Sequence, residues 1–441
     1  MQDRHLSLEL PPAWSVVTES DVKPPPPVPD LTAAVQRALN APIGTPALKD
    51  LVGPKTRVAL VMDDPGRPTP IKRLVPIILT ALREAGARFE HVTGLFAVGA
   101  HEPMSPQAME ARAGSAVVSQ IGCQSFHCRD ENAFEYLGRT RRHTPVYLNR
   151  LAVEADLRIL VGTIEPHPQA SYGGGFKNLL PGLAGARTIG HNHLLMPSPD
   201  HYALIGTPPD KNPMRVDLEE AGRMIAGPTL IVNVILDLDL EPVAVVCGDP
   251  VLAHRAGVSV SRQTYGVEMP DRADVVLVSA YPMERDLRQA GKSILNVVGA
   301  CRRRGVIVSF MACPHGLGGV SLPPFPVPLA LTRGLVNLIG ARAIARLAKH
   351  IPGPAPEERF MINLGLQLLR DYNVLIFSPN IKAGLKNRFR TFIFDDQNQL
   401  FERAGELAGT DRPEVAVFHH GGVSFPVVRH PDTPGAPPYV H

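Results

Sequence analysis

The sequence predicts an α/β protein made of two α/β domains with mostly parallel sheets. Short runs of β-branched and aliphatic residues alternate with longer helical patterns, which is typical of this architecture. The chain has 441 residues, more than the roughly 250 to 300 residues that usually share one core. A fresh series of strands and helices also begins near residue 271, after a polar stretch. These observations together favour two domains over one.

The first domain is expected over residues 1–270. Its buried strands are predicted from runs such as RVALVM and DLRILVGTI, and the amphipathic run IKRLVPIILTALREAG predicts a helix after the first of them. A second helix is expected from about residue 105. The proline run PPPPVP is a stiff, extended stretch more suited to a surface than to a regular element. The expected strands are 57–62, 91–98, 156–164, 229–237 and 241–250, and the helix covers 71–86.

The second domain is expected over residues 271–409 as a smaller three-layer α/β domain. A polar connector at 261–273 leads into it. The strand EVAVF, in the terminal segment 410–441, could complete the sheet of either domain, and its pattern does not choose between them. The expected strands are 274–282, 305–313 and 373–379, and the expected helices are 284–303, 328–350 and 357–371.

Composition and charge exclude several classes of protein. The net charge is +3, from 45 Lys and Arg against 42 Asp and Glu, and no basic run is interleaved with aromatics, which argues against a nucleic-acid partner. No run of about 18 apolar residues is present, and MQDRHLSLELPP lacks the apolar core of a signal peptide. We therefore expect a cytoplasmic protein without a membrane segment. Free thiols are expected for the scattered cysteines Cys123, Cys128, Cys247, Cys301 and Cys313.

Unusual polar residues follow three of the expected strands in the first domain. Asp64 and Arg67 follow the first strand, His101 follows the second, and His167 follows the third, with Lys177 ten positions further on. In open α/β sheets, ligands bind in the crevice beyond the carboxyl ends of the strands. We therefore expect these side chains to converge on one site.

The stretch EPHPQASYGGGFKNLLPGLAGARTIGHNH, residues 165–193, has a composition that does not predict a hydrophobic core. Its lysine is followed by Asn178, so GGGFKN does not fit the phosphate-binding pattern G-x-x-x-x-G-K-[ST]. Glycines at this point would let the backbone pass close to a ligand. His191 and His193 are compatible either with a metal-binding pair or with surface residues, and the spacing leaves both open.

Taken together, these residues predict catalysis. They supply two imidazoles that exchange protons near neutral pH, a cation for a carboxylate, a metal ligand and a nucleophilic amine. Four blocks between residues 61 and 292 resemble the nickel-pincer lactate racemase family. The blocks are VMDDPGRPTP, FAVGAHEPMSP, GTIEPHPQASYGGGFKNLLPGLAG with TIGHNH, and YPMERDLRQAGK.

The resemblance implies a cofactor and a role for each matching residue. In that family a lysine is bonded, as a thioamide, to a nickel-bearing pyridinium mononucleotide (pyridinium-3-thioamide-5-thiocarboxylic acid mononucleotide nickel), and Lys177 matches it. His193 matches the histidine that completes nickel coordination. His101 and His167 match the two acid/base histidines. The remaining implied residues are Asp64, Gly173, Gly174 and Gly175 for the cofactor, and Arg67, Gln289 and Lys292 for the substrate.

The resemblance also implies a reaction, the racemisation or epimerisation of a 2-hydroxy acid. The Cα hydrogen is hard to remove as a proton beside a carboxylate, so it leaves as hydride while one histidine takes the hydroxyl proton. The second histidine then serves the mirror-image substrate. The site is expected in the cleft between the two domains, and the enzymes that mature the cofactor are expected partners.

Two departures from the family pattern concern the substrate. Glu102 stands where an arginine commonly follows the first histidine, which disfavours a plain carboxylate there and favours hydroxyl groups. A sugar acid or another larger 2-hydroxy acid is therefore expected rather than lactate. The family's second-domain aromatic is also unplaced, because the single tryptophan is Trp14.

Two alternatives come from other functional classes. One is a zinc-dependent lyase or hydrolase that uses His191 and His193 with a further ligand. The other is a non-catalytic protein that binds the nickel nucleotide. The first predicts zinc and no added mass on Lys177, and the second predicts no turnover of any 2-hydroxy acid.

Overall fold

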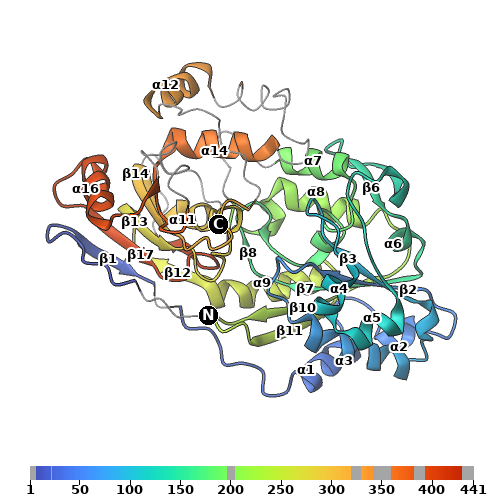
Figure 1. The fold of residues 1–441 in the computed structure, drawn as a ribbon. Coiled ribbons are helices and arrows are strands. Elements are labelled where there is room, and N and C mark those ends of the chain that lie inside the picture. The colour runs from blue at the N-terminus through green and yellow to red at the C-terminus, as the bar shows by residue number, and fades with distance from the viewer. Residues whose placement is uncertain are drawn as a thin grey trace. The chain divides into compact units, whose positions relative to one another are not determined.

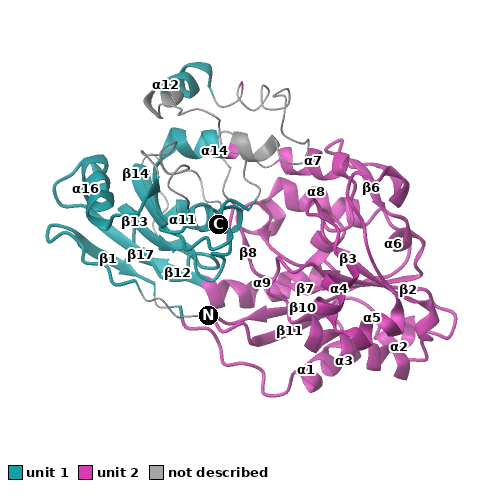
Figure 2. Cartoon of the chain, viewed as in Figure 1, with its two compact units in different colours: residues 1–22, 266–341, 365–441 teal, residues 23–265, 342–364 magenta. Residues whose placement is uncertain are grey.

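The computed structural model contains two compact units, called unit 1 and unit 2 (Figure 2). Unit 2 comprises residues 23–265 and 342–364, and unit 1 comprises residues 1–22, 266–341 and 365–441. The structure describes residues 6–20, 22–195, 204–318, 329–340, 343, 359–381 and 393–429.

Unit 2 is built on a six-stranded sheet in the order β11-β10-β7-β2-β3-β4 (Figure 1). Neighbouring strands are parallel, except that β10 and β11 are antiparallel. The bounds are β2 Val58–Asp63, β3 Val92–Ala97, β4 Cys123–Ser125, β7 Leu157–Thr163, β10 Thr229–Leu236 and β11 Pro242–Gly248. The five strands predicted for this half are therefore confirmed to within two residues.

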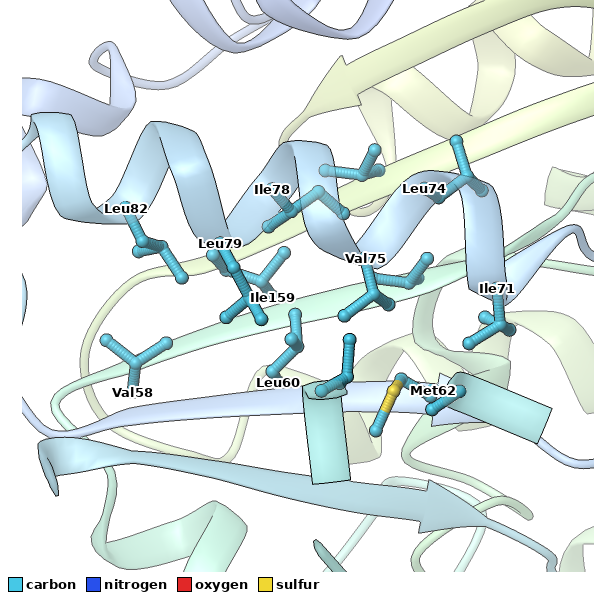
Figure 3. Close-up of a cluster of buried hydrophobic side chains, with 14 of the residues drawn as sticks. Val58, Leu60, Met62, Ile71, Leu74, Val75, Ile78, Leu79, Leu82 and Ile159 are labelled. Carbon is cyan, nitrogen blue, oxygen red and sulfur yellow. The ribbon is translucent and has the colours of Figure 1, made fainter. Parts of the chain in front are cut away.

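Alternating side chains of these strands build a core on each face of the sheet. Leu60 and Met62 of β2 join the core beneath helix α3 (Ile71–Glu84), whereas Val61 joins the core on the opposite face. This alternation follows from the two-residue period of a strand. Figure 3 shows Val75 and Leu79 of α3 directed toward Leu60 of β2, as the helical period requires.

The helices of unit 2 divide between these two cores. The core beneath α3 also takes side chains from α1 (Leu31–Asn40), α4 (Pro106–Ala113) and α5 (Ser115–Ile121). The opposite core takes side chains from α6 (Arg150–Glu154), α7 (Ala186–Leu194), α8 (Pro213–Gly222) and α9 (Leu252–Tyr265). The remaining elements named here are α2 (Leu48–Leu51) and the antiparallel pair β5 (Phe134–Arg139) and β6 (Pro145–Asn149).

Unit 1 contains a second six-stranded sheet, in the order β1-β17-β13-β14-β15-β16, and every neighbouring pair in it is parallel. The α/β prediction with mostly parallel sheets is thus confirmed. The strand that the sequence left open is β17, which lies between β1 and β13. The bounds are β1 Ser15–Glu19, β13 Ala273–Ser279, β14 Cys301–Phe310, β15 Asn373–Phe377, β16 Ile393–Phe394 and β17 Glu414–Phe418.

Five helices and a small strand pair complete the described part of unit 1 and its flanks. Strands β12 and β18 pair in parallel outside the main sheet. The first part of the predicted helix 328–350 is present as α12, and residues 328, 341–342 and 344–350 lie outside the described residues. The bounds are α10 Leu287–Ala290, α11 Lys292–Val297, α12 Leu329–Ile339, α14 Arg359–Asp371, α16 Gln397–Ala408, β12 Gly266–Met269 and β18 Phe425–Val428.

Two expectations about this region are wrong. The stretch 261–273 is not a polar connector, because α9 continues to Tyr265 and β12 follows it. Tyr265 Oη, at the end of α9, donates to the carbonyl of Leu236 at 2.5 Å. The expected helix 284–303 is also broken, into α10 and α11 at Gly291, and β14 begins at Cys301. Parallel pairing of β14 with β13 outweighs the local helical pattern there.

Two further expectations from composition can be compared with the structure. The structure describes all five cysteines, and none of them is in a disulfide bond, as expected. Within the described residues, no helix combines the length and the apolar character needed to cross a membrane.

We expect the substitution Leu74→Ala to weaken unit 2 strongly. Leu74 of α3 is fully buried in the core on this face of the sheet, so removal of its side chain leaves a cavity and lowers the free energy of unfolding by about 2 to 5 kcal/mol. Urea unfolding followed by circular dichroism measures the loss. The exposed Lys72, on the same helix, provides the control, and Lys72→Ala should change stability by less than about 0.5 kcal/mol. Equal losses in the two variants would contradict the packing described.

Candidate active site

A carboxylate joins the loops that follow β2 and β3. His101 Nδ1 lies 2.5 Å from Asp64 Oδ2, and the backbone N–H of Gly66 donates to Asp64 Oδ1 at 2.9 Å. The side chain of Asp64 is 7% exposed and that of His101 is 40% exposed. The acidic group is therefore enclosed, while the imidazole that it holds reaches the surface of the site.

The charge state of Asp64 follows from its neighbours. Burial by itself raises the pKa of this carboxyl, but the hydrogen bond and charge of His101, together with the charge of Arg67, hold the pKa below its usual value. The carboxylate is therefore ionised at neutral pH and accepts hydrogen bonds only. His101 Nδ1 consequently carries the shared hydrogen and donates it to Asp64.

Arg67 links this loop to the end of β7. Its Nη1 donates to Glu165 Oε1 at 2.8 Å, and its backbone carbonyl accepts from Arg112 Nη2 at 3.1 Å. Burial lowers the pKa of Arg67, but the charges of Glu165 and Asp64 outweigh this and raise it. The guanidinium is thus fixed in place, with only part of its donor set used by Glu165.

Glu165 opens the stretch 165–193, and its sequence pattern predicted no role for it. It is buried, and its Oε2 has no hydrogen-bond partner among the described residues. An acidic residue directly after a buried strand, at the same sheet edge where Arg67 follows another strand, is the signal that could have identified it. Its Oε1 fixes Arg67, so it sets the orientation of the cation.

The sequence predicted no role for Asp63 either, which is the last residue of β2. Thr69 Oγ1 donates to Asp63 Oδ2 at 2.6 Å and lies 2.7 Å from Thr163 Oγ1. Burial raises the pKa of Asp63 to about 6, against the opposing effects of the Thr69 hydrogen bond and of the Arg67 and Arg112 charges. The group is therefore a buried acid that titrates close to neutral pH.

His167 lies in a tight hairpin formed by β8 (Pro166–His167) and β9 (Ser171–Tyr172). Its Nδ1 accepts from the backbone N–H groups of Gln169 at 3.2 Å and Ala170 at 3.1 Å. Its Nε2 lies 3.5 Å from the Nζ of Lys177. Both side chains are buried, so the structure brings the second imidazole and the lysine together.

The glycine triplet before Lys177 packs tightly against protein atoms. Gly174 and Gly175 have φ angles of 67° and 63°, a conformation that favours glycine. A Cβ on Gly174 would lie 2.6 Å from Asn233 Oδ1, and one on Gly175 would lie 2.7 Å from Arg215 Nη2. These glycines are therefore required by the loop's own packing, and the close approach that they permit is to the protein.

Buried side chains hold this loop through its backbone. The guanidinium of Arg215 donates to the carbonyl of Gly174 from Nη1 and Nη2, both at 3.2 Å. His254 Nε2 donates to the carbonyl of Gly173 at 2.8 Å, and Gly175 N donates to Asn233 Oδ1 at 2.8 Å. The three positioning side chains come from α8, α9 and β10, far from the loop in sequence.

The expectation that this stretch lies outside a core is wrong. Residues 165–180 are all buried, and Phe176, Leu179 and Leu180 belong to the core that also takes side chains of α8. The polar composition misled the prediction because the loop's buried backbone groups find partners within the protein.

His193 lies on α7 and has the hydrogen bonding of a metal-ligating histidine. Its Nδ1 donates to the carbonyl of Ile189 at 2.9 Å, which places the ring's lone pair on Nε2. Desolvation and the positive charge of Lys177 lower the pKa of His193 to about 4. The ring is therefore neutral at pH 7, which a metal ligand must be.

His191 does not form a pair with His193. Residues two apart on a helix do not face one another, and His191 Nδ1 lies 2.9 Å from Thr144 Oγ1, which donates to Asp217 Oδ2. In the described parts of the chain, no three His, Cys, Asp or Glu side chains are grouped so that they could hold a metal ion. The arrangement of His191 instead ties α7 to neighbouring elements.

Gln289 and Lys292, the two site residues expected from the second half of the chain, form a hydrogen bond with each other. Lys292 Nζ donates to Gln289 Oε1 at 2.5 Å. They lie on two short helices, α11 and α10, rather than on one. Trp14 packs edge-on against Phe401, with ring centroids 5.6 Å apart, inside the core of unit 1.

The described contacts therefore connect six of the expected residues within unit 2. They run from His101 through Asp64 and Arg67 to Glu165, then along the chain to His167, and from there to Lys177 and its electrostatic neighbour His193. Such a set can bind an anion, carry a proton and offer an amine and an imidazole nitrogen to a cofactor.

The N-terminal part of the chain matches a protein-family model. The model describes the lactate racemase N-terminal domain, and it covers residues 1–203. Two curated relatives are lactate racemases. That of Thermoanaerobacterium thermosaccharolyticum is 32% identical over 287 residues, which span 65% of this chain and 66% of the relative. That of Lactiplantibacillus plantarum is 28% identical over 293 residues, or 65% of this chain and 67% of the relative.

Two solved structures share the fold. The lactate racemase apoprotein of Thermoanaerobacterium thermosaccharolyticum has a TM-score of 0.78 and 23% identity, and the alignment covers 96% of this chain and 97% of that one. A protein of Thermotoga maritima has a TM-score of 0.59 and 15% identity, with coverage of 87% and 96%. These likenesses confirm the α/β architecture.

We expect Asp63→Asn to change the pH dependence of stability. The folded protein holds the Asp63 proton more tightly than the unfolded chain, because burial raises the pKa to about 6. The stabilisation linked to this proton is full below pH of about 4 and is lost as the pH rises through 6. Asparagine cannot ionise, so the variant should gain about 1 to 3 kcal/mol relative to wild type between pH 5 and 7.5. Urea unfolding at both pH values measures the difference.

Asp156→Asn is the matched control. A hydrogen bond from Arg57 lowers the pKa of the Asp156 carboxyl to about 2, so this group is ionised at both pH values. The difference between Asp156→Asn and wild type should therefore stay constant between pH 5 and 7.5. If Asp63→Asn behaves in the same way, the inferred titration of Asp63 is wrong.

Proposed function

Because the chain belongs to the lactate racemase family, we propose that it is an isomerase that inverts the hydroxyl-bearing carbon of a 2-hydroxy acid. The observation that best supports this is the connected set His101, Asp64, Arg67, His167 and Lys177 at the carboxyl end of the sheet in unit 2. The set combines proton carriers with a cation for a carboxylate, which a 2-hydroxy acid requires.

Arg67 is proposed to bind the substrate carboxylate. A guanidinium forms two parallel hydrogen bonds with a carboxylate and so fixes its plane. Glu165 already holds Nη1 of Arg67 at 2.8 Å, which orients the remaining N–H groups before the substrate arrives. Gln289 and Lys292 of unit 1 are proposed as further substrate ligands, and their mutual hydrogen bond fixes the ammonium group.

The histidines are proposed to act on the substrate hydroxyl. Loss of the Cα hydrogen as a proton would place a carbanion beside a carboxylate, so loss as hydride is easier. The hydroxyl proton must leave in the same step, and a positioned imidazole is suited to accept it. His101, backed by the ionised Asp64, has the arrangement of a general base.

The residues present fit a lysine-tethered nickel-pincer nucleotide. Lys177 would carry the covalent thioamide bond, and His193 would supply an imidazole nitrogen to nickel from Nε2, since its Nδ1 is occupied by Ile189. Asp64 would border the group, and the loop Gly173, Gly174 and Gly175 would position the lysine that carries it. When bound, this cofactor supplies the hydride acceptor of the reaction.

The proposed function is tested by producing the protein together with the cofactor-making enzymes. We expect added mass on the peptide that contains Lys177, and interconversion of the two enantiomers of a 2-hydroxy acid. Lys177→Ala should lack both, because it removes the tether. Because Lys177 is buried and its Nζ lies 3.5 Å from His167 Nε2, circular dichroism and the unfolding temperature of the variant check that the fold is retained.

Two other outcomes would contradict the proposal. Bound zinc without added mass on Lys177 would favour a hydrolase or lyase. A mass adduct without turnover of any 2-hydroxy acid would favour a protein that carries the nickel nucleotide.

The proposed substrate is a sugar acid or another larger 2-hydroxy acid. Glu102 follows His101 directly and is exposed, so it adds negative charge beside a site for anions and can accept hydrogen bonds from substrate hydroxyls. We expect the loaded enzyme to turn over aldonic acids with a higher kcat/KM than lactate or malate. Glu102→Arg should move the preference toward lactate, with Glu110→Arg, on helix α4, as the charge-matched control. A clear preference of the wild type for lactate would contradict this substrate class.

A further inference from the structure

The hairpin that carries His167 contains a residue in a disfavoured backbone conformation. Ser171, four positions after His167, has a φ angle of 62° and is fully buried. This left-handed conformation favours glycine, and another residue keeps it only where the surrounding structure imposes it. The contacts of Ser171 must therefore supply what its own backbone preference does not.

The conformation of Ser171 shapes the turn that faces His167. The backbone N–H groups of Gln169 and Ala170, inside this turn, lie 3.2 and 3.1 Å from His167 Nδ1. Strand β9 pairs back onto β8 where Ser171 lies opposite His167. The two N–H groups therefore meet the imidazole only while the backbone of Ser171 keeps its angle.

Asn212 holds this turn through its side-chain amide. Its Nδ2 donates to the carbonyl of Gln169 at 2.7 Å and to Ser171 Oγ at 2.9 Å, while its Oδ1 accepts from the backbone N–H of Arg215 at 3.0 Å. A backbone N–H can only donate and a carbonyl can only accept, so both ends of the amide are assigned without ambiguity. Asn212 is fully buried. One side chain thus caps helix α8 and also bonds the turn beside His167.

The hydroxyl of Ser171 is bonded on both sides. Thr207 Oγ1 donates to the carbonyl of Leu204 at 2.7 Å. The hydrogen between Thr207 Oγ1 and Ser171 Oγ, which lie 3.0 Å apart, therefore comes from Ser171. Ser171 Oγ accepts from Asn212 and donates to Thr207, and these two bonds hold the residue in its left-handed conformation.

Building on the proposed function, in which His167 exchanges a proton with the substrate, we propose that Asn212 is a positioning residue for His167. It acts through Gln169 and Ser171, and it does not contact the substrate. A displacement of about 1 Å in an active site can lower the rate by about 10²-fold. Loss of the Asn212 amide should therefore affect the chemical step more than substrate binding.

Asn212→Ser tests this role in the cofactor-loaded enzyme. Serine caps a helix about as well as asparagine, but it has no amide to donate to Gln169. We expect kcat to fall by about 10- to 100-fold, and KM to change by less than about threefold because Arg67 keeps its own contacts. An unchanged kcat would overturn the proposal.

Asn149→Ser is the matched control. Asn149 is also buried in unit 2 and caps α6, with Oδ1 accepting from Leu151 N at 3.1 Å and Nδ2 donating to the carbonyl of Ala133 at 3.3 Å. The substitution removes the same chemical groups but leaves the His167 hairpin intact. Its kcat should stay within about twofold of wild type, since it touches no group of the site. Equal losses in the two variants would show a general effect of losing a buried amide and would overturn the proposal.

Two substitutions of Ser171 test the backbone conformation separately. Ser171→Gly and Ser171→Ala both remove the hydroxyl, but only glycine adopts the left-handed conformation freely. We expect the glycine variant to have a kcat at least about threefold higher than the alanine variant. If the two variants have the same kcat, the angle of Ser171 does not position His167, and the inference is wrong.

Hydrogen exchange provides a readout that does not require activity. In the protein without cofactor, peptide mass spectrometry should show faster exchange at Gln169 and Ala170 in Asn212→Ser than in wild type. The segment 213–222 of α8 should exchange as in wild type, because the serine retains the cap. Unchanged exchange at Gln169 and Ala170 would overturn the proposal, as would equally faster exchange in both segments, which would indicate a general loss of structure.

The two kinds of measurement separate this inference from the function on which it rests. If the wild type turns over no 2-hydroxy acid, the proposed function fails, and hydrogen exchange still decides whether Asn212 holds the turn. If turnover is found and Asn212→Ser retains the wild-type kcat, the proposed function stands and this inference fails.

Discussion

The burial of a polar loop is the constraint on which the site depends. The loop from Gly173 to Lys177 lies inside unit 2, where each backbone carbonyl needs a donor. Arg215, itself fully buried, donates to Gly174, and its charge is balanced by Glu219 at 2.8 Å. Arg215 belongs to helix α8, which packs in the core of unit 2. Its hydrogen bonds therefore tie the backbone of Gly174, three residues before Lys177, to that core. The lysine's position is therefore a property of the fold, even though it lies on a loop.

The sequence predicted the parts of the fold that local pattern determines. The strands of unit 2 are continuous apolar runs, as expected for parallel strands covered on both faces. Strand β1 and the break at Gly291 were not predictable in this way, because β1 pairs with β17 across almost the whole chain and β14 displaces a helix by pairing with β13. The candidate site divides similarly. His101 and His167 are found from their places after strands, whereas the contribution of Glu165 appears only with its contact to Arg67.

Positive and negative side chains alternate in the site, and each one influences the protonation of its neighbours. Asp64 lies between His101 and Arg67, and Arg67 lies between Asp64 and Glu165. A change at one position therefore alters the proton affinity of its neighbours, so effects of substitutions along this series should not add. An incoming anion also meets a guanidinium whose charge is already partly compensated by Glu165. The proposed substrate would therefore be bound through oriented hydrogen bonds more than through net charge.

The pairing of β1 with β17 has a consequence for the order in which the protein is made. When the ribosome has synthesised residue 265, every strand of the unit 2 sheet has been made. Strand β1, within the first 19 residues, has also been made by then, but it does not yet have its partner strand. Its partner strand emerges only with residues 414–418. An early segment must therefore stay unpaired through most of translation, and during that time its exposed strand edge is open to binding by a chaperone or by another nascent chain.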